Sequence, residues 1–128
     1  MYGFFTTYNG TVDEAKTAVT EALAAEGFGV LTEINVAATL KKKLGVDRRP
    51  YHILGACQPG LANQAIQEEP DIGLLLPCNV IVREEEDDSV SVGFVDPEAM
   101  LSITGRDDMK AFAEEVKSRL QRVCESLG

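Results

Sequence analysis

Two cysteines that stand beside prolines in the middle of the chain are the residues best placed for chemistry. Cys57 ends an apolar run and is followed by Gln58 and Pro59, and Cys78 directly follows Pro77. If Cys57 leaves a strand just before a helix, the unpaired N–H groups and the dipole of that helix lower the pKa of its thiol. One hypothesis is therefore redox chemistry or ligand contact through the thiols. The other is that both are small side chains packed in the core.

A third proline-containing segment extends this candidate site. The three segments, Leu54–Pro59, Leu76–Val80 and Val95–Pro97, each combine turn-forming and polar residues with the end of an apolar run. Rigid elements present their binding residues on such strand ends. We therefore expect a small molecule or a partner to be held where the segments meet. The candidate ligand-binding residues are Cys57, Gln58, Pro59, Pro77, Cys78, Asp96 and Pro97.

The sequence contains none of the common metal or catalytic motifs. A structural zinc site needs four ligands, and His52 is the only histidine available beside the thiols and carboxylates. If residues 51–57 form a strand, His52 points to the face opposite Cys57, so a Cys–His dyad is not expected. A glycine-rich phosphate loop, a His-Glu-x-x-His motif and a nucleophile elbow are also missing. We predict no metal site, and the cofactor and the catalytic residues stay unassigned.

Charge restricts the partners. The net charge is −9, which repels nucleic acid phosphates and anionic lipid. The basic clusters Lys41–Lys43 and Arg48–Arg49 are expected to be solvated surface. The N-terminal residues lack a signal-peptide pattern, the longest apolar run is too short for a bilayer, and the number of cysteines is odd. We expect a cytoplasmic protein without structural disulfides that binds neither nucleic acid nor membrane.

The elements that must position the candidate residues follow from periodicity. Thr11 and Glu14 have the spacing of a capping box, and Cys124 lies on the apolar stripe of a long terminal helix. Alternation from Phe28 to Val36 predicts a strand with one apolar face. The predicted strands are 2–8, 28–36, 51–57, 72–84 and 89–96, and the predicted helices are 11–27, 37–44, 59–69, a short turn at 97–101, and 109–127.

The order of elements predicts the fold class. It reads β-α-β-α-β-α-β-β-α, and 128 residues suffice for one domain spanning residues 1–128. Amphipathic helices need a sheet to cover. The prediction is an α+β domain whose helices pack on a roughly five-stranded, mixed and largely antiparallel sheet.

The three segments also resemble the domain of unknown function 302 family. In that family a Gly-Ala-Cys-Asn-Pro-like segment precedes Leu-Pro-Cys and then a strand ending in Pro; here these read Gly55-Ala56-Cys57-Gln58-Pro59, Leu76-Pro77-Cys78 and Val95-Asp96-Pro97. Leu31-Thr32-Glu33-Ile34 and Lys42-Lys43-Leu44-Gly45 match too, so the resemblance covers nearly the whole chain. Gln58 departs from the usual Asn. The resemblance implies a compact α+β fold, a homodimer and no assigned enzymatic activity.

Three functions are consistent with these residues. The leading hypothesis is a homodimeric ligand-binding or accessory module that holds a small molecule at the three segments. The second is a thiol-dependent redox or sulfur-transfer enzyme that uses Cys57 and Cys78. The third is a purely structural interaction protein, in which the conspicuous residues only maintain the fold.

Overall fold

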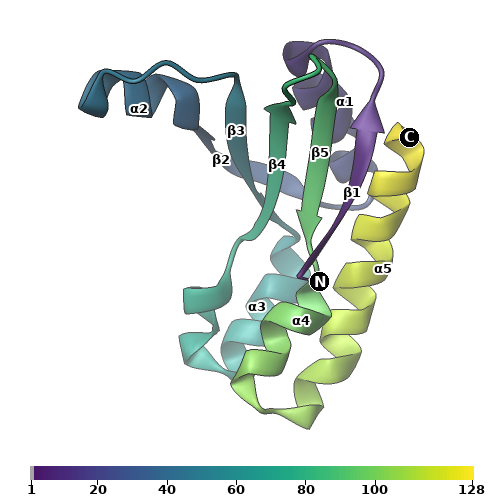
Figure 1. The fold of residues 1–128 in the computed structure, drawn as a ribbon. Helices are drawn as coiled ribbons and strands as arrows, with labels where there is room; N and C mark the ends of the chain where they lie inside the picture. Colours follow the sequence, from purple (N-terminus) through teal and green to yellow (C-terminus); the bar gives the residue numbers. More distant parts are fainter. Residues whose placement is uncertain (1) are drawn as a thin grey trace.

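Five strands form one antiparallel sheet in the computed structural model, which describes residues 2–128 (Figure 1). Their order across the sheet is β1-β5-β4-β3-β2. All four pairings are antiparallel, so the α+β class and the five strands are confirmed, and the sheet is antiparallel throughout rather than mixed. The strands are β1 (Gly3–Tyr8), β2 (Gly29–Asn35), β3 (Tyr51–Cys57), β4 (Cys78–Glu84) and β5 (Val90–Val95).

The helices occur in the predicted order. The capping box is present at the first of them, because Thr11 Oγ1 accepts from the Glu14 N–H at 3.1 Å and the Glu14 carboxylate accepts from the Thr11 N–H at 3.0 Å. Short 3-10 helices cover Pro70–Leu75, Ser102–Thr104 and Asp107–Met109. The α-helices are α1 (Val12–Ala25), α2 (Val36–Leu44), α3 (Pro59–Glu68), α4 (Pro97–Leu101) and α5 (Lys110–Leu127).

Helices α1 and α5 cover one face of the sheet, and the main core lies between them and the strands. Val19 and Leu23 of α1, Leu120 of α5, and Val80 and Val82 of β4 are all fully buried there. A second, smaller core joins α3, α4 and the N-terminal half of α5 beyond the ends of the strands, at the bottom of Figure 1. None of the helices in residues 2–128 is long and apolar enough to cross a membrane.

The predicted strand 72–84 is too long. Pro70–Leu75 forms a 3-10 helix, and β4 begins only at Cys78 after a cis peptide bond between Leu76 and Pro77. Proline has no N–H to give to a strand ladder, whereas it is well tolerated in the first turn of a helix. Leu74, which strand alternation would place beside Cys78, is instead exposed.

The predicted apolar face of the second strand is also wrong. The pairing of β2 with β3 shifts register between Val30 and Thr32, as in a β-bulge. Val30 pairs with Ala56 on the covered face, but Ile34 pairs with Ile53 on the opposite face. One extra residue therefore separates side chains that a strict period of two would place together.

Candidate functional site

The three proline-containing segments come together at one end of the sheet. β3 ends there, β4 begins there and β5 ends there, because these strands are antiparallel neighbours. Ala56 of β3 is the register partner of Cys78 of β4, and Val80 of β4 is the partner of Phe94 of β5. The strand ends lead directly into α3 and α4, so both helices begin beside the candidate residues.

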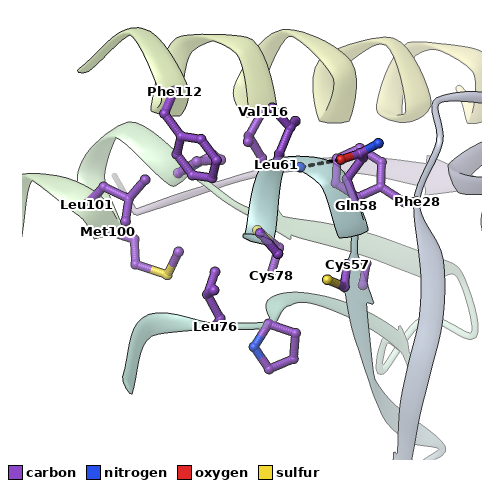
Figure 2. A pocket seen from close by; sticks show the side chains of 14 residues that line it. Phe28, Cys57, Gln58, Leu61, Leu76, Cys78, Met100, Leu101, Phe112 and Val116 are labelled. Carbon is purple, nitrogen blue, oxygen red and sulfur yellow. Dashed lines mark hydrogen bonds between the residues drawn. The ribbon is translucent and has the colours of Figure 1, made fainter. Parts of the chain in front are cut away.

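A small apolar cavity lies at this meeting point, beneath α3, α4 and α5 (Figure 2). Its volume is about 20 Å³, which corresponds to roughly one water molecule. No side chain that lines it is charged. Five of the seven candidate residues lie in its wall, namely Cys57, Gln58, Pro77, Cys78 and Pro97.

The other two candidates lie outside the cavity wall. Pro59 is exposed in the first turn of α3. Asp96 is the N-cap of α4, where its Oδ1 accepts from the Glu98 N–H at 2.9 Å and its Oδ2 lies 3.0 Å from Lys117 Nζ on α5. Burial raises the pKa of Asp96, but the bonds from Lys117 and the helix N–H groups outweigh it and leave the pKa below its usual value. Asp96 thus anchors α4 against α5.

Gln58 has a definite structural role. Its Oε1 accepts from the Leu61 N–H at 2.6 Å, which makes it the N-cap of α3 (dashed line in Figure 2). The longer amide therefore still caps the helix in the place where the resembling family usually has Asn. The Gln58 side-chain oxygen is used in this cap, and the rest of the half-buried side chain forms part of the cavity wall.

Gly55 shapes the other side of the cavity. A Cβ at this position would lie 2.8 Å from Pro77 Cγ and would also collide with Thr32. A side chain there would force either Pro77 or β2 away from β3. The absence of a Cβ at residue 55 thus permits Pro77 to pack against β3 and close the wall.

The two thiols differ in their surroundings. Cys78 is only 7% exposed, and this burial, together with the nearby Cys57, raises the pKa of its thiol from the ordinary 9.0 to about 11. Cys78 is therefore protonated at neutral pH, and a protonated thiol is a poor nucleophile. Cys57 is half-buried, and both cysteines are free (Figure 2). Cys124 packs half-buried on α5, and burial and Glu125 raise its pKa as well.

His52 lies at the far end of β3 from Cys57. It is buried on the covered face with Leu54 and Ala56, as alternation along β3 predicts. Its Nδ1 is 3.2 Å from Glu33 Oε2, which Lys16 Nζ also approaches at 2.8 Å. It therefore does not pair with Cys57, and within residues 2–128 no group of three or more His, Cys, Asp or Glu side chains is arranged to hold a metal ion.

Most of the cavity wall was not anticipated as functional. Its remaining side chains are apolar and come from the helices and from the chain around them; they include Phe28, Leu61, Leu76, Met100, Phe112 and Val116. Phe112 and Val116 belong to the stripe that predicts the terminal helix. An amphipathic stripe looks the same whether it fills a core or lines a cavity, so the sequence carries no signal that separates the two.

Comparisons with known proteins agree with this architecture. The sequence profile described as "Domain of unknown function DUF302" matches residues 4–127. The crystal structure of an uncharacterized conserved DUF302 protein from Bacillus stearothermophilus is 26% identical, with a TM-score of 0.93 over 100% of this chain and 99% of that one. No curated protein matches the chain significantly. With a profile match over almost its whole length, the chain belongs to the DUF302 family of domains of unknown function.

Proposed function

We propose that this protein is a ligand-binding or accessory module that works as a homodimer and holds a small molecule in the apolar cavity. The observation that carries this proposal is the convergence of three separate strand ends on one cavity. Five residues singled out for their types and positions line it together: Cys57, Gln58, Pro77, Cys78 and Pro97. Cavities at the ends of rigid elements are the usual location of small-molecule sites.

The cavity wall indicates the class of ligand. Because no charged side chain lines it, a charged ligand would lose its hydration without compensation. The ligand is therefore small, uncharged and largely apolar. The volume of about 20 Å³ means that a ligand of several atoms must displace part of the wall. Leu76 and Met100 are half-buried there, and methionine repacks readily, so these two side chains are the ones that move.

Benzene is a suitable probe, with binding followed by NMR on methyl-labelled protein. We expect saturable shift changes at Leu61, Leu76 and Met100. Ala62→Leu, which fills the cavity, should weaken binding at least tenfold, whereas Ala111→Leu on the exposed side of α5 should not. Shift changes that are absent, or that Ala62→Leu leaves intact, would refute the cavity as the ligand site.

A thiol-dependent redox or sulfur-transfer enzyme is the second candidate. It is favoured by the position of Cys57 and Cys78 on neighbouring strands and in one cavity wall. It is opposed by the pKa of Cys78, which burial raises to about 11. Mild oxidation that links the two residues, measured by peptide mass, would place this function first. If neither benzene nor an oxidant acts on the site, the purely structural role remains.

The cellular setting is part of the same proposal. We place the protein in the cytoplasm, without nucleic acid or membrane partners. A net charge of −9 and three free cysteines support this. A salt-dependent gel shift of duplex DNA at low micromolar protein would contradict the exclusion of nucleic acid.

A further inference from the structure

The face of the sheet turned away from α1 and α5 carries a continuous apolar row. Register partners follow one another across all five strands, and the row is Phe5, Gly93, Ile81, Ile53 and Ile34. A Cβ on Gly93 would lie 2.5 Å from the Phe5 ring and 3.0 Å from Ile81, so Phe5 leans over Gly93 and closes the gap in the row. Phe5 and Ile34, at its two ends, are 45% and 49% exposed.

This open face is also almost uncharged. Among the strand residues whose side chains alternate onto it, Arg83 alone is charged, and it is paired with Glu85. The whole chain contains 12 basic and 21 acidic residues. Polar side chains border the apolar row, with Thr7, Ser91 and Arg83 on one side and Thr32 and Asn79 on the other. An exposed apolar row with a polar rim, on a chain of net charge −9, marks a surface on which another protein docks.

A basic arm projects from one edge of the same sheet. It comprises residues 36–49, that is α2 and the loop after it, and it extends away from the body at the upper left of Figure 1. No residue of α2 is buried, and Leu44 and Val46 are 69% and 45% exposed. A helix of nine residues is marginal without tertiary packing, and α2 meets its own chain mainly at β2 and β3, where Val36 and Leu40 are half-buried. Most of its remaining surface has no packing partner within residues 2–128.

The charges of the arm and the body are complementary. The arm contains five basic residues and one acidic residue, so the rest of the chain carries a net charge of −13. Arg49 is paired with Glu84 and Asp88 of its own chain, and Lys41 is paired with Asp47 of the arm. Lys42 and Lys43 are exposed and make no ion pair within residues 2–128, so they are charges free for a partner. A second copy of this chain therefore offers both a matching apolar face and a negative surface for the basic arm, which a partner of arbitrary charge does not.

The size of the face explains why the arm is needed. Strands lie about 4.8 Å apart and rise about 3.4 Å per residue, so five strands of six or seven residues present roughly 500 Å² in projection. A stable interface buries roughly 800 Å² on each partner, so the face alone is too small and the arm supplies further contact area.

The alternative of pairing two sheets along their β2 edges is disfavoured, because the β-bulge between Val30 and Thr32 distorts this edge strand.

The geometry points to an isologous homodimer in which the open faces of two protomers pack together and the basic arm of each lies against the body of the other. This inference rests on the proposed homodimer and names its surface, but it does not depend on the ligand cavity. Ile81 and Ile53 lie at the centre of the contact, and Phe5 and Ile34 lie at its ends. The arm adds an electrostatic contribution that salt screens.

Light scattering on the full-length protein at about 10 µM tests this surface. We expect twice the chain mass for the wild type and the monomer mass for Phe5→Lys and Ile34→Lys, with the dissociation constant raised at least tenfold. Both side chains are about half exposed, so both variants should fold, which circular dichroism checks. Matched controls are Leu74→Lys and Ile103→Lys, which are 87% and 75% exposed outside the strands and should stay dimeric.

The arm needs its own variants. Lys42→Glu with Lys43→Glu should weaken the dimer several-fold and reduce its salt dependence, whereas Lys110→Glu, exposed at the start of α5, should do neither. A monomeric wild type would refute the homodimer and this surface together. A dimeric wild type whose Phe5 and Ile34 variants remain dimeric, or whose control variants dissociate, would refute the surface alone.

Discussion

The two faces of the sheet are built from alternate residues of the same strands, yet they differ sharply. On the covered face Leu54, Val80 and Val92 are at most 1% exposed beneath α1 and α5. On the open face their neighbours Ile53 and Ile81 are only half-buried, although they are equally apolar. Polar residues border the row that contains these isoleucines, among them Thr7, Ser91 and Asn79, as on a sheet face that meets water, but the row itself is apolar. This apolar row is the part of the open face that the proposed homodimer would cover.

The largest expected effect compares adjacent residues on opposite faces. Leu54→Ala should lower the free energy of unfolding by about 2–5 kcal/mol, because it opens a cavity in the main core. Ile53→Ala, measured at a concentration where the protein is monomeric, should cost about 1 kcal/mol, because Ile53 already contacts water. Urea denaturation measures both. Equal losses in the monomer would show that the two faces do not differ as described.

Alkaline pH tests the covered face at Cys78. Its folded-state pKa of about 11 lies above its ordinary value of 9.0, so the unfolded chain releases the proton first. Below pH 9 the thiol is protonated in both states and its full contribution to stability is present. As the pH rises from about 9 to 11, the free energy of unfolding falls by about 2–3 kcal/mol. Denaturation curves of the wild type and Cys78→Ala across this range measure it. An identical slope in both proteins would show that Cys78 titrates normally.

Asp96 tests how α4 is held against α5, one of the two helices on the covered face. Asp96→Ala should cost about 1–2 kcal/mol at pH 7, because α4 loses its cap and its ion pair with Lys117. Since its pKa is lowered on folding, this contribution is present above about pH 4 and is lost as the pH falls through the folded-state pKa. Thermal melting of the wild type and Asp96→Ala, at pH 7 and below about pH 4, measures this loss of stability. Lys117→Met should reproduce only part of the loss, and a full loss would assign the effect to the ion pair alone.

The smallest expected effect is a difference in reactivity between the cysteines on the two faces of the sheet. Cys57 is half-buried and continues the open-face alternation of β3, whereas Cys78 belongs to the main core. With a maleimide at neutral pH, we expect Cys57 to react first and Cys78 only as fast as the protein unfolds. Peptide mass spectrometry follows each site. Equal rates would mean that the cavity opens readily to solvent.

The local elements were largely predictable. The capping box of Thr11 and Glu14, the alternation along β3 and the helix after Pro59 were all identified from neighbours in the sequence. Hydrogen bonds and apolar periodicity within a few residues determine such features. The predicted strand 72–84 begins too early, because the short apolar run between Pro70 and Pro77 is consistent with either a strand or a 3-10 helix.

The candidate site was predicted in part. Cys57 and Cys78 were singled out from the sequence, and they lie on the neighbouring strands β3 and β4 and in one cavity wall. Asp96 and Pro59 matched the same proline-rich pattern, but they serve the starts of α4 and α3 instead of the cavity wall. A strand end that caps a helix and a strand end that lines a cavity use the same residue types, so composition does not separate them.

By itself the sequence determined the order of the elements, the antiparallel hairpin of β4 and β5, and which residues of β3 share a face. Only the tertiary structure decided that the bulge at Val30 and Thr32 moves Ile34 onto the open face, and that α1 and α5 cover the same side. Periodicity records how a side chain is oriented relative to its neighbours in the chain. The side that helices cover depends on contacts between residues far apart in sequence, which no local pattern encodes.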